Sequence, residues 1–125
     1  MPGRRNTLSA TTIDKGWPHQ VALPDDICIE ENLTMIFQFL KDRGLDCRTR
    51  HVQAIWPDRR YQHMRLHCFP DRASVEAFQA VFGGEFFDPS RDREGGKVRG
   101  PWRRHGAWAR LLESGPLKVP KILRD

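Results

Sequence analysis

Apolar residues recur along the chain with two spacings, one typical of helices and one of strands. Between residues 31 and 43 the apolar positions lie three or four residues apart, which places them on one helical stripe. That stripe comprises Leu33, Ile36, Phe37 and Leu40. Gly44 follows it and suits the left-handed position after a helix C-terminus. The pattern therefore predicts a helix over 31–43.

A second helical pattern covers residues 72–82. Asp71 precedes it as a favourable N-cap, and Gly83 and Gly84 end it. Its stripe consists of Ser74, Ala77, Phe78 and Val81. Together with the first helix and the strands below, it supplies a predicted core: Leu33, Ile36, Phe37, Leu40, Met64, Leu66, Phe78 and Val81.

Alternation with a period of two predicts four strands, near residues 19–23, 48–56, 61–69 and 85–87. The two middle strands form a hairpin, because Pro57 and Asp58 favour a turn between them. Both apolar sets can face one core only if the loop has an odd length of three or five residues, or a bulge. We expect Ala54 opposite Met64 and Val52 opposite Leu66.

The order strand, helix, strand, strand, helix, strand matches the split βαβ, or ferredoxin-like (βαββαβ), arrangement of an α+β domain over residues 17–88. Right-handed crossovers would place both helices on one face of the sheet and leave the other face open. Residues 1–16 are expected to form a flexible arm. Residues 89–125 form a basic extension, with a flexible stretch over 90–100 and a short helix near 101–113 that docks on the body.

Charge is unevenly distributed over the 125 residues. The net charge is +5, and residues 88–125 alone carry ten basic and five acidic groups. A basic tail on a nearly neutral body is typical of attraction to an anionic partner, either nucleic acid or an acidic protein, and equally of a solvated tail that keeps the protein soluble. No apolar run approaches the ~20 residues that span a bilayer, so no membrane partner is expected. Three unpaired cysteines and no signal peptide lead us to expect a cytoplasmic protein.

The segment Thr12-Ile13-Asp14-Lys15-Gly16-Trp17-Pro18-His19 resembles the opening of a family of small proteobacterial proteins to which no activity is assigned. This resemblance implies a bacterial, cytoplasmic setting and gives no residue a role.

The open sheet face would display aromatic and basic side chains together, as in surfaces that stack bases and pair phosphates. The RNA-recognition motif has the same element order, although the third strand here lacks its glycine and aromatic consensus. The basic tail adds further arginines beside a tryptophan. The predicted nucleic-acid or partner-binding residues are therefore Tyr61, His63, Arg65, His67, Arg99, Trp102, Arg103 and Arg104.

No group of nucleophile, base and orienting residue can be assembled from the sequence, so we expect no catalytic residues and no cofactor. A metal site on His51, His63 and His67 is disfavoured, because Arg65 lies between two of them. The sequence thus predicts a non-catalytic binding protein, with nucleic acid as the leading partner. The alternative is a protein-interaction or homodimeric module that uses the open face, unless the tail covers that face.

Overall fold

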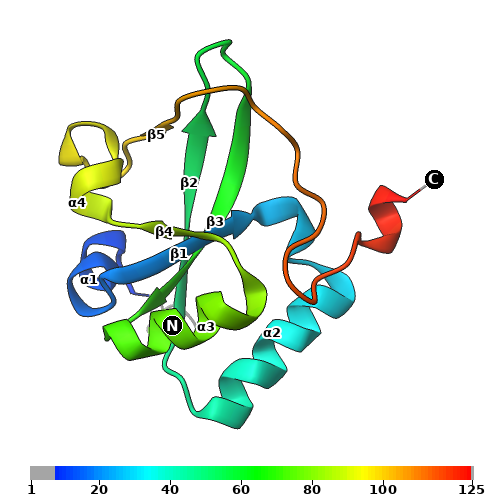
Figure 1. Cartoon of the computed structure of the whole chain (residues 1–125). Helices are drawn as coiled ribbons and strands as arrows, with labels where there is room; N and C mark the ends of the chain where they lie inside the picture. The colour runs from blue at the N-terminus through cyan, green and yellow to red at the C-terminus, as the bar shows by residue number, and fades with distance from the viewer. Residues whose placement is uncertain (1–7, 125) are drawn as a thin grey trace, which may run out of the picture.

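Five strands form one curled sheet in the computed structural model, which describes residues 8–124 (Figure 1). The strands are β1 (His19–Pro24), β2 (Arg48–Ile55), β3 (Tyr61–Phe69), β4 (Glu85–Phe87) and β5 (Trp102–Arg103). Their order across the sheet is β4-β1-β3-β2-β5. Neighbouring strands are antiparallel, except that β5 runs parallel to β2. The fold is therefore of the mixed α+β class.

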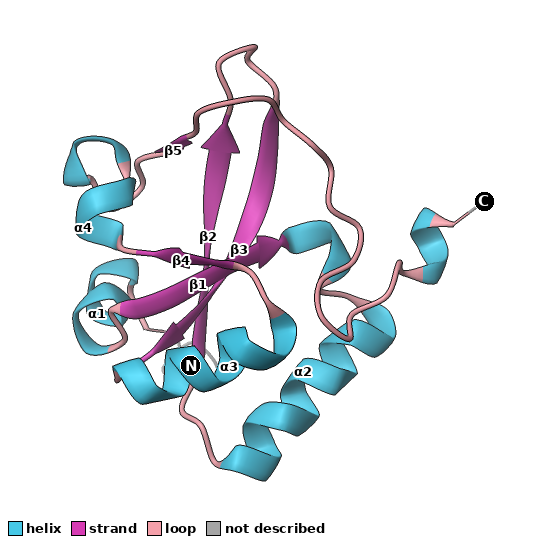
Figure 2. Cartoon of the chain, viewed as in Figure 1, coloured by secondary structure: helices cyan, strands magenta, loops and turns pink. Residues whose placement is uncertain are grey.

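Two longer helices and two short ones surround the sheet (Figure 2). They are α1 (Ala10–Gly16), α2 (Glu30–Arg43), α3 (Arg72–Phe82) and α4 (Pro89–Asp92). Single 3₁₀ turns lie at Asp25–Ile27, Glu94–Gly96 and Lys121–Leu123. The predictions of both longer helices and of the first four strands are confirmed.

Local sequence signals explain where the longer helices begin and end. The Asp71 carboxylate accepts a hydrogen bond from the backbone N–H of Ser74 at 2.8 Å, which satisfies one of the free donors at the start of α3. Gly44 ends α2 with a φ of 61°, a left-handed conformation that costs glycine little. These predicted caps are confirmed.

The buried stripe of α2 differs from the prediction. Ile36 and Asn32 are buried, whereas Phe37 is 59% exposed. Phe39 turns inward instead and meets the Phe82 ring of α3 edge-on, with ring centroids 5.2 Å apart. On α3 the prediction of a buried Val81 is also wrong. Each helix is rotated about its axis relative to the predicted stripe, because the two helices pack against each other as well as against the sheet.

The hairpin loop spans residues 56–60, so the predicted odd length is confirmed. The predicted pairing is wrong by two positions, because Val52 lies opposite Met64 and Ala54 opposite Gln62. The Trp56 N–H donates to the Arg60 carbonyl at 2.8 Å, which closes the turn over the three residues between them. Arg59 takes a φ of 74° there. A shift of two residues keeps the same side chains together on one face of the hairpin. The predicted single core that joins Met64 and Leu66 to the helix residues is wrong, because these two residues lie in a separate core.

Each face of the sheet carries a packed core, so the face expected to be open unless something covered it is covered by parts of the same chain. On one face, α2 and α3 pack over β1 and β3 around a core of buried residues: Val21, Leu23, Ile27, Cys28, Ile36, Phe69, Val75, Phe78, Phe82 and Leu117. On the other face a second core contains Ile13, Ala22, Val52, Ala54, Met64, Leu66, Cys68, Phe87 and Trp102. The apolar hairpin set therefore packs on the face opposite the longer helices.

The regions outside the body also differ from the predictions. Residues 10–16 of the predicted arm form α1, capped by Ser9, and Ile13 is buried in the second core. Residues 1–7 of that arm lie outside the described residues. The predicted helix near 101–113 is absent; β5 pairs with β2 instead, and Gly106 takes a φ of 74°.

The C-terminal extension docks on the body as predicted, but mainly through Leu117 rather than through the predicted apolar stripe of Trp108, Leu111 and Leu112. Leu117 is fully buried in the first core, with Leu112 packed beside it, whereas Leu111 is exposed. The buried side chain of Asn32 holds this segment, since it donates to the Lys118 carbonyl and accepts from the Lys118 N–H.

Candidate functional site

The structure separates the predicted binding residues into two groups on opposite faces of the sheet. Tyr61, His63, Arg65 and His67 lie on β3, on the face that α2 and α3 partly cover. Trp102, Arg103 and Arg104 lie at or after β5, and the Trp102 ring packs into the core of the other face. Arg99 is exposed in the loop before β5. The residues therefore do not form one surface.

His67 belongs to the core. Its ring is buried and stacks on Phe78, with ring centroids 4.8 Å apart. Burial, helped by the positive charge of Arg65, lowers the pKa of His67 from 6.5 to about 3. The imidazole is thus neutral at physiological pH and cannot reach a ligand without local unfolding.

Arg65 is occupied within the fold. Its Nε donates to Asp25 Oδ1 at 2.8 Å, and its Nη1 donates to the Cys28 carbonyl at 3.0 Å. His51 Nε2 lies 3.1 Å from the same Asp25 oxygen. These contacts hold the turn after β1 against the hairpin, so the main role of Arg65 is to stabilise the fold.

The residues of β5 are mostly engaged as well. Trp102 is buried and meets the Phe87 ring edge-on at 5.0 Å. The Arg104 guanidinium lies 3.9 Å from the centre of the Trp102 ring and pairs with Glu85 at 2.7 Å. Arg103 is exposed and pairs with Glu94 at 3.1 Å. Within this group, the guanidinium group of Arg103 remains exposed to solvent.

Exposed aromatic and basic side chains gather instead at the end of the β2–β3 hairpin. Tyr61 is 57% exposed there, and its ring meets His63 edge-on at 5.7 Å. The Arg60 guanidinium lies 5.4 Å from the centre of the Trp108 ring. We call the set Arg59, Arg60, Tyr61, His63 and Trp108 the hairpin-tip surface. Figure 1 shows the segment after β5 crossing beside this hairpin end.

Tyr61 and His63 of this surface are among the binding residues predicted from the sequence, whereas Arg59, Arg60 and Trp108 are not. Arg59 and Arg60 directly precede Tyr61 in the predicted turn, so their adjacency could have indicated them. Trp108 could not be found in this way. Its Nε1 donates to Gln62 Oε1 at 3.4 Å across 46 positions of sequence, a contact that only the chain path creates.

Two shallow hollows flank Tyr61 and Trp108, and both residues line each of them. The hollow on the turn side has a volume of about 350 Å³ and is completed by Asp58, Arg59 and Arg60. The other, of about 290 Å³, also includes Asp25, Asp26 and Arg110. Arg110 pairs with Asp26 at 2.8 Å. Within residues 8–124, Arg59 makes no ion pair, so its charge is available.

The described residues offer little support for a metal site, a cysteine nucleophile or a membrane-spanning helix. No three His, Cys, Asp or Glu side chains among them are grouped as a metal site. Burial raises the pKa of Cys28 and of Cys47 to about 12, and it also raises that of Cys68, so thiolate nucleophiles are disfavoured. No helix within residues 8–124 has the length and apolar character needed to cross a bilayer.

Comparisons with known proteins found no matching family model, no matching curated protein and no matching solved structure.

Proposed function

We propose that this protein binds single-stranded nucleic acid through the hairpin-tip surface and catalyses no reaction. The observation that carries the proposal is the pair of aromatic rings, Tyr61 and Trp108, that share two hollows beside arginine side chains. Bases stack on exposed aromatic rings irrespective of sequence, while arginines contact the backbone phosphates.

The charge at this surface supports weak and sequence-tolerant binding. Arg59 and Arg60 provide about two phosphate contacts, whereas the carboxylates of Asp25, Asp26 and Asp58 oppose the approach of a polyanion. For single strands, two contacts give a slope of about −1.4 in log K against log salt concentration. Affinity should therefore fall only modestly with salt.

The test is a fluorescence anisotropy titration of short labelled single-stranded DNA and RNA with the full chain, at two salt concentrations. Tyr61→Ala should weaken binding by about 5-fold or more, because stacking contributes ~1–3 kcal/mol per base. The matched control is Phe37→Ala, since Phe37 is an equally exposed aromatic residue on α2.

Charge is tested in the same way. Arg59→Ala should weaken binding and reduce the salt slope, whereas Arg72→Ala, which removes an exposed arginine of α3, should leave both unchanged. If no binding occurs at low salt, or if Tyr61→Ala and Phe37→Ala behave alike, the proposed function is wrong.

A protein-interaction or homodimeric module is the second proposal, and it has less support. It rested on an open sheet face, and both faces carry packed cores. A dimer would therefore need another surface, and sedimentation of the full chain over a range of concentrations would test for one.

The body, residues 17–88, is proposed to be ferredoxin-like. The partial order β4-β1-β3-β2, its antiparallel pairings, and the packing of α2 and α3 in one core support this assignment. A cytoplasmic, bacterial setting is likewise proposed, and three free cysteines support the cytoplasmic part of this proposal, because a reducing compartment keeps thiols unpaired. Fractionation of cells that express the full chain would test the location.

A further inference from the structure

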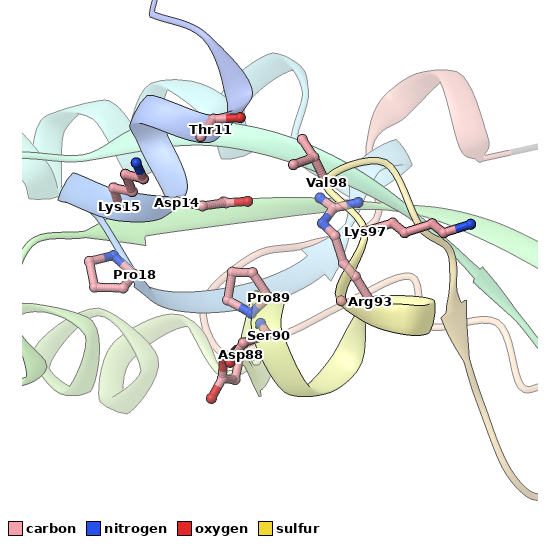
Figure 3. A pocket seen from close by; sticks show the side chains of 11 residues that line it. Thr11, Asp14, Lys15, Pro18, Asp88, Pro89, Ser90, Arg93, Lys97 and Val98 are labelled. Atoms are coloured by element: carbon pink, nitrogen blue, oxygen red, sulfur yellow. Dashed lines mark hydrogen bonds between the residues drawn. The ribbon is translucent and has the colours of Figure 1, made fainter.

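A cavity of about 430 Å³ lies between α1 and the segment around α4, away from the hairpin-tip surface (Figure 3). Its walls come from two stretches of the chain that are far apart in sequence. They include Asp14 and Lys15 on one side, and Asp88, Ser90, Arg93 and Lys97 on the other.

Two buried guanidinium groups, those of Arg50 and Arg93, and the half-buried carboxylate of Asp14 lie beside this cavity. Arg50 donates to one carboxylate oxygen of Asp14, and Gln20 Nε2 donates to the other at 3.0 Å. Arg93, which is 97% buried, forms no ion pair with a carboxylate of residues 8–124. Its Nη1 donates to the Gly100 carbonyl at 3.1 Å and its Nη2 to the His51 carbonyl at 2.8 Å.

The buried cluster therefore carries one positive charge in excess. Burial and the nearby Arg50 lower the pKa of Arg93 to about 10, which still leaves this guanidinium protonated at neutral pH. A buried charge without a counter-ion is costly, so a group that supplied the missing negative charge would be stabilised here.

One donor of Arg93 is also unused. Its Nε is buried and has no hydrogen-bond partner within the described part of the chain. Figure 3 shows the Arg93 guanidinium and the Asp14 carboxylate directed toward each other from opposite sides of the cavity. The Lys97 side chain extends away from them, so Arg93 is the cation best placed to contact a ligand inside.

We propose that this cavity binds a small oxyanion, a phosphate or carboxylate group, which accepts a hydrogen bond from Arg93 Nε and neutralises the excess charge. Lys15 and Lys97, which make no ion pairs in residues 8–124, add positive potential at the rim. Asp14 and Asp88 oppose an anion. The Asp14 carboxylate already accepts hydrogen bonds from Arg50 and Gln20, and the Asp88 carboxylate accepts them from Ser90. These hydrogen bonds reduce the repulsion between the carboxylates and an anion.

The test follows the Nε–H signals of arginine in nitrogen-15 NMR spectra of the full chain at constant ionic strength. Sodium phosphate and sodium acetate are titrated in separate arms, with sodium chloride as the reference. The Arg93 signal should move saturably with one of the oxyanions, whereas that of the exposed Arg72 should move no more than in chloride. The oxyanion that gives the tighter curve identifies the preferred group.

A charge reversal at the rim provides the variant. Lys15→Glu should weaken oxyanion binding by at least 3-fold, and the matched control, Lys41→Glu on α2, should leave it unchanged. An Arg93 signal that responds equally to chloride and both oxyanions, or equal binding by the two variants, would overturn the proposal. Tyr61→Ala should leave oxyanion binding at this cavity unchanged. A failure of the oxyanion proposal can therefore be distinguished from a failure of the proposed nucleic-acid binding.

Discussion

His67 and Phe78 stack with their ring planes 26° apart and their centroids separated by 4.8 Å. This contact places an imidazole at the centre of the core between the sheet and α3, where it serves as an aromatic ring. Its Nδ1 is buried without a hydrogen-bond partner among the described residues. The protonated form is thus strongly disfavoured in the folded state.

Stability should fall on acidification because of His67. The folded pKa of about 3 lies below the unfolded value of 6.5, so the unfolded chain binds the proton first as pH falls. The free energy of unfolding should decrease by about 1.4 kcal/mol per pH unit below 6.5, or about 2 kcal/mol by pH 5. Urea unfolding at pH 7 and pH 5 measures this loss.

The control for this prediction is an exposed histidine of the same strand. His63→Gln should keep the wild-type pH dependence, whereas His67→Gln should flatten it while lowering stability at pH 7. Equal pH dependence in the wild-type protein and His67→Gln would contradict the assignment.

Truncation of two phenylalanines should lower the free energy of unfolding to very different extents. Phe78 is fully buried against Phe69, Phe82 and His67, so Phe78→Ala should cost about 3–5 kcal/mol of unfolding free energy. Phe37 is mostly solvated, so Phe37→Ala should change it by less than about 0.5 kcal/mol. Chemical denaturation of both variants measures the difference, and a large loss in Phe37→Ala would show that α2 buries the other stripe.

The docking of the C-terminal extension can be tested with two leucines of the same segment. Leu117 is fully buried and Leu111 is 56% exposed. Leu117→Ala should lower the free energy of unfolding by about 2–5 kcal/mol, and Leu111→Ala should lower it by less than about 0.5 kcal/mol. Thermal and urea unfolding provide the comparison. Similar small losses in both variants would mean that the extension is not docked in solution.

The buried ion pair of Arg50 and Asp14 should be sensitive to the loss of one partner. Both side chains are largely buried, and their nearest charged atoms lie 2.5 Å apart. Asp14→Asn leaves two buried guanidinium groups with no carboxylate and should cost about 3–5 kcal/mol. The exposed pair of Arg72 and Glu76 is the control, since Glu76→Gln should cost less than about 1 kcal/mol. Equal effects would argue against burial of the cluster.

Local patterns in the sequence predicted most of the elements. The spacing of apolar residues located α2 and α3, and the Asp71 cap and Gly44 fixed their ends within a residue, because these signals act over a few positions of chain. The helix expected near 101–113 is absent, because Leu111 is exposed and has no apolar partner to hold a helix against the body, and because the pairing of Trp102 with Ala54 requires an extended backbone. In the candidate interface, the sequence indicated Tyr61 as a binding residue but did not indicate that Trp108 lies beside it.

The alternation of side chains was determined by the sequence alone, but the face of the sheet that each set occupies was decided by the tertiary structure. Val21 lies opposite His67, and Ala22 lies opposite Leu66. The apolar hairpin residues therefore share a face with Ala22, and Val21 faces the longer helices. A period of two assigns residues to two sets within each strand, whereas the match between sets of different strands depends on register. Register between β1 and β3 is set by contacts between residues 40 to 50 positions apart, from Pro24↔Met64 to His19↔Phe69, which no local pattern encodes.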